Sequence, residues 1–142
     1  MEDIDTARKI VENFILEMNT WEKESEIIEN DENDGLDWRQ KDALIKENVA
    51  IIINKYCTPK KRLMSNPHSI SRGLEGTYIY DPNEEKVVDA KSEKPNRICV
   101  FTYKEEERYY YCYVLLRKAN EWLIDSKKSR FYEDEKWDNS YL

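Results

Sequence analysis

The 142-residue sequence is poor in glycine, proline, histidine and cysteine, with three, four, one and three residues of each. With so few glycines it contains neither G-x-x-x-x-G-K-[ST] nor G-x-G-x-x-G, the motifs whose backbone amides cradle phosphates. No apolar run approaches the roughly 18 residues of a spanning helix, and the start of the chain lacks the basic and apolar regions of a signal peptide. We therefore expect no nucleotide site, no membrane segment and a cytoplasmic location.

Histidine and cysteine chemistry has little support either. A Ser-His-Asp or Cys-His site needs a histidine, and the only one, His68, lies within a loop predicted at residues 58–73. Cys57, Cys99 and Cys112 are odd in number and lack C-x-x-C spacing, which argues against a disulfide framework and a zinc site. We predict no cofactor, no metal and reduced thiols.

Basic residues are outnumbered, with 23 Lys and Arg against 30 Asp and Glu and a net charge of −7. This balance argues against nucleic acid or an anionic membrane as a partner, because both bind an excess of Lys and Arg. The acids gather at residues 22–34, 105–107 and 133–135. Such segments are usually solvated surface, but together they would attract a cationic protein. The sequence does not show whether they share one face.

The sequence does have a clear change of hydrophobic period. Apolar residues step by three and four over residues 3–28 and again over about 37–56, which predicts two helices packed together. After Gly76 the period becomes two, and strands are predicted at 77–81, 86–90, 97–103, 108–117 and 121–129. Helices followed by a meandering antiparallel sheet predict one α+β domain over residues 1–142.

The two cysteines of the predicted sheet fall on strands joined by a short loop. If residues 104–107 form that loop, Cys99 lies directly opposite Cys112. Opposed strand residues have Cβ atoms about 4.5 to 5.5 Å apart, a little wide for a relaxed disulfide. We predict two neighbouring reduced thiols.

The strand period also divides residues 109–116 between two faces. One face carries three phenol rings, at Tyr109, Tyr111 and Tyr113. The other carries Cys112 and Val114, which we expect to face the helices. The phenol rings would then lie on the outer face, as part of a partner interface or a homodimer interface, or covered by Trp137.

The best single candidate for acid–base chemistry is Asp125, within the apolar strand sequence "EWLIDSKK". A desolvated carboxylate there would titrate near neutrality. Strict alternation places Asp125 on the same face as Leu123 and Lys127. We favour an aspartate at the strand surface paired with a neighbouring lysine over a catalytic base.

Several strings in order resemble one family. These are "ARKIVENFILEMNTWE" at 7–22, "INKYCTPKKR" at 53–62, "SISRG" at 69–73, "YDPNEEKVVD" at 80–89 and "YVLLRKANEWLIDSKK" at 113–128. Together they resemble the nuclear-transport-factor-2-fold immunity proteins of bacterial polymorphic toxin systems, of the Rhs-associated kind. The resemblance implies a cone-like α+β fold with helices on the concave side of a curved sheet. It also implies binding and neutralisation of a cognate toxin domain, without catalysis.

No contact residue carries over from that family by motif. We expect a basic toxin, such as a nuclease domain, to meet the acidic segments and the phenol rings at Glu26, Glu29, Asp31, Glu32, Asp34, Glu105, Glu106, Tyr109, Tyr111 and Tyr113. The alternative is a small-molecule-binding protein or an isomerase-like or dehydratase-like enzyme that uses the cavity of the same cone. It would rely on Asp125 or on a tyrosine at 78, 80, 111 or 113. A closed, dry, apolar interior would argue against it.

Overall fold

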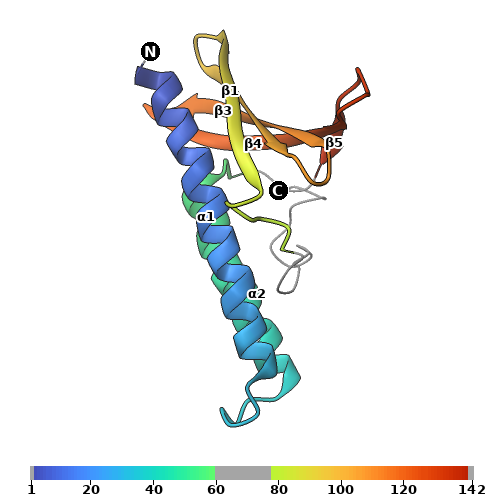
Figure 1. Ribbon diagram of the computed structural model, residues 1–142. Helices are drawn as coiled ribbons and strands as arrows, with labels where there is room; N and C mark the ends of the chain where they lie inside the picture. Colours follow the sequence, from blue (N-terminus) through green and yellow to red (C-terminus); the bar gives the residue numbers. More distant parts are fainter. Residues whose placement is uncertain (1, 60–77, 141–142) are drawn as a thin grey trace.

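The computed structural model describes residues 2–59 and 78–140. The chain forms helices α1 (Glu2–Asn30) and α2 (Trp38–Tyr56), then strands β1 (Glu85–Lys94), β2 (Arg97–Lys104), β3 (Tyr109–Lys118), β4 (Glu121–Phe131) and β5 (Asp138–Ser140). The strands form one antiparallel sheet in the order β1-β2-β3-β4-β5. Figure 1 shows the two helices as a long hairpin that meets the sheet at one end. The predicted α+β class is confirmed.

Both predicted helices are confirmed, but one predicted strand is not formed and one observed strand was not predicted. Residues 78–80 are not a strand, because the backbone N–H groups of Ile79 and Tyr80 donate to the Glu22 carboxylate, at 2.9 and 2.7 Å, rather than to a neighbouring strand. The short strand β5 was not predicted. His68 and most of the predicted loop lie outside the described residues. Within the described ranges, neither helix is long and apolar enough to cross a membrane.

The core lies between the helices and the concave face of the sheet. Phe14 of α1 is fully buried and makes edge-to-face contacts with the rings of Tyr56, Tyr80 and Tyr113, at centroid distances of 5.9, 5.5 and 6.4 Å. Around it pack the buried apolar residues Val11, Met18, Val49, Val100, Leu115 and Ile124. The apolar stripe of α1 is therefore what holds the hairpin against the sheet.

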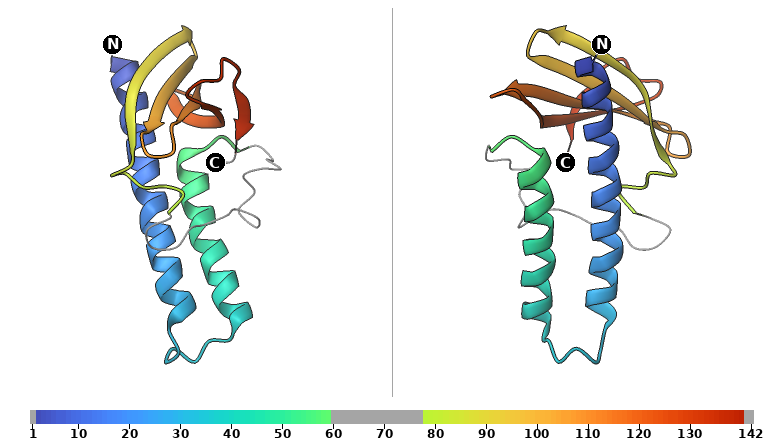
Figure 2. Two further views of the ribbon diagram at one scale, coloured as in Figure 1. Left: turned by 45° about the vertical axis from the view of Figure 1, so that its right-hand side comes forward. Right: turned by 90° about the vertical axis from the view of Figure 1, so that its left-hand side faces the viewer.

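The helical hairpin is joined along its length and anchored at its base. The indole N–H of Trp21 donates to the carbonyl of Ile45, 2.9 Å away, and ties α1 to α2. At the base, the backbone N–H of Thr58 donates to the carbonyl of Ile124 at 2.9 Å. Figure 2 shows that the far end of the hairpin extends well beyond the sheet.

The predicted facing of β3 is wrong. Tyr113 and Leu115 face the helices and are fully buried, whereas Cys112 and Val114 lie in a separate cluster with Cys99, next to Phe101 and Trp137. The large Tyr113 side chain spans the space to α1, where its ring meets Phe14 and its hydroxyl donates to Glu85 at 2.8 Å. Trp137 therefore covers the cysteine face and not the tyrosine face.

The predicted pairing of β2 with β3 is also wrong, by two positions. Cys99 pairs with Val114, and Cys112 pairs with Phe101. The turn occupies residues 105–108, one residue later than predicted, and ends at Arg108 with φ +59°. Cys99 and Cys112 still share a face as diagonal neighbours, and both are free thiols. A hydrogen bond between the two raises the pKa of Cys99 and lowers that of Cys112.

A bulge at Asp125 breaks the alternation of β4. Ile124 pairs with Leu115 while Ser126 pairs with Val114, so Asp125 is an extra residue on its strand. Ile124 and Lys127 are consequently both buried, although they are three positions apart. The strict alternation that placed Asp125 and Lys127 on one face does not hold. The carboxylate of Asp125 accepts a hydrogen bond from the Thr58 hydroxyl at 2.9 Å.

Candidate partner-binding surface

The most exposed part of the helical hairpin is its tip, which we define as residues 29–41. All residues from Glu29 to Gln40 are exposed. Figures 1 and 2 show the tip at the end of the hairpin away from the sheet. Four of the predicted contact residues lie on it, at Glu29, Asp31, Glu32 and Asp34. The tip therefore presents acidic side chains without cover from the rest of the described chain.

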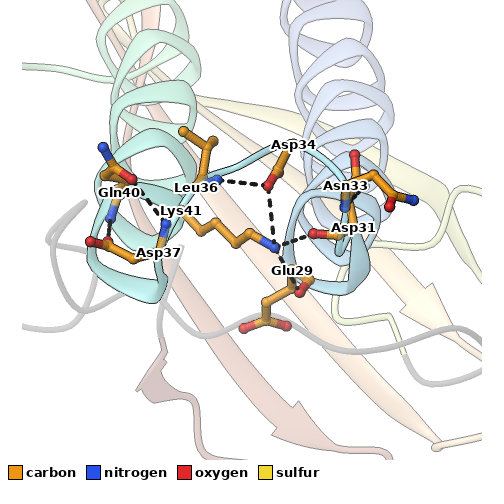
Figure 3. Close-up of polar contacts among 8 residues, drawn as sticks. All are labelled: Glu29, Asp31, Asn33, Asp34, Leu36, Asp37, Gln40 and Lys41. Carbon is orange, nitrogen blue, oxygen red and sulfur yellow. Dashed lines mark hydrogen bonds and ion pairs between the residues drawn. The ribbon is translucent and has the colours of Figure 1, made fainter.

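The loop of the hairpin tip is shaped by its own carboxylates (Figure 3). Asp31 accepts from the backbone N–H of Asn33 at 2.9 Å, and Asp34 accepts from that of Leu36 at 3.0 Å. Within the second of these turns Gly35 adopts φ +73°, a conformation that glycine reaches without strain. Two of the predicted acidic contacts thus have a structural role as well.

Helix α2 begins at a capping box. The side chain of Asp37 accepts from the backbone N–H of Gln40, and the side chain of Gln40 accepts from the backbone N–H of Asp37, both at 2.9 Å. The two bonds satisfy backbone donors that the first helical turn cannot use. The direction in which α2 leaves the loop is therefore fixed locally.

Lys41 ties the two sides of the hairpin tip together, as Figure 3 shows. Its ammonium group donates to the carbonyls of Asp31 and, at 3.5 Å, Glu29, and lies 3.8 Å from the Asp34 carboxylate. The positive charge of Lys41 is thus directed into the loop. Glu32, in contrast, has no hydrogen bond or ion pair to another described residue, so its carboxylate is free to meet a partner.

Apolar side chains accompany these acids. Trp38 is 72% exposed, with the guanidinium of Arg39 5.3 Å from its ring, and Leu36 is 37% exposed. Trp38 was not among the predicted contacts. The signal available in the sequence was its position: it follows the acidic run, and the buried stripe of its helix begins only at Ile45.

A groove of about 610 Å³ runs along α1 next to the tip. It is lined by Lys23, Glu26, Ile27, Asn30, Asp31 and Tyr78. The Tyr78 hydroxyl donates to Glu26 at 3.1 Å, which places this predicted contact at the wall of the groove. Ile27, exposed to 68%, adds apolar surface to the same wall.

The remaining predicted contacts lie elsewhere. Glu105 and Glu106 are exposed in the turn between β2 and β3, on the sheet and apart from the hairpin tip (Figure 1). Tyr109 is 38% exposed beside them and Tyr111 is half-buried. Tyr113 is fully buried, so the expectation that it offers an exposed ring is wrong. The structure does not bring the two acidic segments together.

The interior of the protein is not purely apolar. Four charged residues are buried between the helices and the sheet, at Glu22, Glu85, Lys104 and Lys127. Tyrosines 80, 111 and 113 also point their rings toward the Lys127 ammonium group, with centroids 4.8, 4.4 and 5.2 Å away. The described residues hold no group of three or more His, Cys, Asp or Glu side chains placed for a metal ion.

Comparison with known proteins decides the family. The family described as "NTF2 fold immunity protein" matches residues 6–140. The chain belongs to the NTF2-fold immunity protein family. This immunity protein is 32% identical over 139 residues to "Immunity protein RhsIA" of Dickeya dadantii (strain 3937), and the match covers 96% of each chain. No solved structure matches it.

These matches confirm the resemblance to Rhs-type immunity proteins of this fold, and the two helices and five-stranded antiparallel sheet are consistent with it. The residues that contact a partner are not given by family membership. In this NTF2-fold immunity protein the hairpin tip combines unpaired acidic charge, exposed apolar area and a fixed backbone. It is therefore our candidate surface.

Proposed function

We propose that this immunity protein neutralises a cognate toxin domain, in the cytoplasm and without catalysis, by covering part of the toxin surface with its hairpin tip. Membership of the immunity protein family supports the toxin as partner. The observation that carries the choice of surface is Trp38, which is 72% exposed next to an acidic loop. The toxin surface that would match this tip is basic, as the nucleic-acid-binding surface of a nuclease domain is, and has a recess for the Trp38 ring.

The chemistry of the hairpin tip suits binding in three ways. Tryptophan is enriched among the few residues that carry most of the energy of an interface, so Trp38 is the expected anchor. Unpaired acids such as Glu32 speed the encounter with a basic surface and orient it. The capping box and the Lys41 contacts hold the loop before binding, which reduces the entropy lost in the complex.

The first test concerns the anchor. The experiment starts by identifying a toxin gene next to the gene for this protein; its toxin domain is then purified, and the Kd of the complex is measured by isothermal titration calorimetry. Trp38→Ala is expected to raise the Kd by about 30-fold or more, because it removes the buried ring of the complex. Tyr132→Ala is the control, because Tyr132 is an exposed aromatic residue, at 40%, on the sheet side.

The control variant should bind within a few-fold of the wild type. If Trp38→Ala binds the toxin domain with the wild-type Kd, the hairpin tip is not part of the interface. A wild-type protein that does not bind the toxin at all would contradict the proposed function itself.

The second test concerns charge. Glu32→Lys should lower the association rate by about tenfold and weaken its dependence on salt, because a basic partner then meets a positive group. Glu135→Lys makes the same change of charge on an exposed residue of the turn between β4 and β5. If both variants slow association equally, the effect belongs to net charge, and a local contact at Glu32 is ruled out.

A further inference from the structure

A cluster of polar side chains lies inside the core, between α1 and the concave face of the sheet. Glu85 at the start of β1 is 3% exposed, Lys127 of β4 is 5% exposed, and Tyr80 and Tyr113 are 1% and 0% exposed. None of them belongs to the hairpin tip. Burying such groups is unfavourable unless each polar atom finds a hydrogen-bond partner.

The hydrogen bonds of this cluster are incomplete. One oxygen of Glu85, Oε2, accepts from the hydroxyls of Thr102 and Tyr113, at 2.6 and 2.8 Å. The other oxygen of Glu85, Oε1, and the hydroxyl of Tyr80 are buried and have no partner within the described part of the chain. An acceptor and a donor are thus left over in the same region of the core.

Lys127 lies close to the rings of both tyrosines of this cluster. Its ammonium group is 4.8 Å from the centre of the Tyr80 ring and 5.2 Å from that of Tyr113. Burial raises the pKa of Tyr80, and the charge of Glu85 raises it further. The same charge opposes the effect of burial on the pKa of Lys127, so these groups lie within electrostatic reach of one another. The charges of Lys127 and Glu85 are opposite, so a guest that contacts both groups needs no net charge of its own.

We propose that Tyr80, Glu85 and Lys127 form an internal binding site for a neutral guest that both accepts and donates hydrogen bonds. The guest accepts from the ammonium group of Lys127 and the hydroxyl of Tyr80, and it donates to Oε1 of Glu85. Water is the smallest such guest, and a small hydroxyl or amide compound has the same chemistry. Buried water commonly satisfies polar groups left over in a core. This site lies beyond the proposed toxin-binding function and does not depend on it.

The direct test is a high-resolution crystal structure of the purified full-length protein. We expect density for a guest within hydrogen-bond distance of at least two of the three side chains. A direct contact between Lys127 Nζ and Glu85 Oε1 with no density between them, or a side chain of the protein in that place, would overturn the proposal. Native mass spectrometry separates the two sources, because an organic guest adds its own mass and a single water does not survive as a defined adduct.

A second test works in solution and uses Tyr80→Phe. If a guest is bound, the variant loses one of its hydrogen bonds, and the melting temperature falls by about 3 °C. If the hydroxyl is truly unpaired, its removal leaves the melting temperature unchanged or raises it, and the proposal fails. Tyr111→Phe is the matched control, because its ring also contacts Lys127, at 4.4 Å, while its hydroxyl is not a buried atom without a partner.

Discussion

The two ends of the helical hairpin contrast sharply. Near the sheet, Phe14 of α1 and Val49 of α2 are fully buried in the core between the two helices and the sheet. At the tip, Ile27 and Trp38 are 68% and 72% exposed. The same pair of helices therefore contributes a core at one end and uncovered apolar surface at the other. The exposed apolar side chains at this end support the proposal that the tip meets a partner.

Charged residues show the same contrast. Glu22 is fully buried and accepts from the backbone N–H groups of Ile79 and Tyr80. Glu32, ten positions later, is exposed and free of contacts with described residues. One carboxylate thus holds the fold together, and the other is available for recognition. Residue type alone does not separate these two roles.

The largest expected effect is on the free energy of unfolding, when Phe14 in the core and Trp38 at the tip are each replaced by alanine. Phe14→Ala should lower the free energy of unfolding by about 3 to 5 kcal/mol, because a cavity remains where three rings met. Trp38→Ala should change it by less than about 0.5 kcal/mol. Urea denaturation measures both. Equal losses would show that the tip is part of the folded core, and the contrast would be broken.

A second prediction concerns the buried Lys127. Its pKa is lowered from 10.5 to about 8, mainly by burial and also by the charge of Lys104, while the charges of Glu85 and Glu107 act in the opposite direction. The unfolded chain then binds more protons than the folded chain between pH 8 and 10.5, so stability rises with pH in that window. The expected gain is about 2 kcal/mol between pH 7.5 and 9.5.

This gain can be isolated from other titrations by comparing the wild type with Lys127→Met in urea denaturation at each pH. Above pH 10 the raised pKa values of Tyr80 and Tyr113 act in the opposite direction, since their folded forms stay protonated longer. The rise should be absent from Lys127→Met. Parallel curves for the two proteins would show that Lys127 titrates normally.

The smallest expected effect concerns the start of α2. Asp37→Ala removes the capping box and should lower the free energy of unfolding by about 1 kcal/mol. It should also weaken toxin binding, because the loop is no longer held. Asp42→Ala is the control, since it removes only an exposed ion pair with Lys46 and should change stability by less than about 0.5 kcal/mol. Equal effects of the two variants would contradict a special role for the cap.

Much of the fold was predictable from hydrophobic period, but the candidate site only in part. The acids of the tip were found from composition, because a run such as Asp31 to Asp34 has no apolar stripe to bury. Trp38 was missed, because its position after the acidic run was not weighed, although its ring is 72% exposed in the structure. Tyr113 was misassigned, because period two divides a strand into two faces without saying which one meets the helices.

The sequence by itself determined where the helices and the four longer strands lie, since the spacing of apolar residues and the turn residues act locally. Only the tertiary structure decided that Tyr113 rather than Val114 enters the core, that Cys99 lies diagonal to Cys112, and that Lys127 is buried. A turn that starts one residue later shifts a pairing by two positions, and one bulge reverses the alternation of a strand. These choices depend on which arrangement packs best against α1, which no local pattern records.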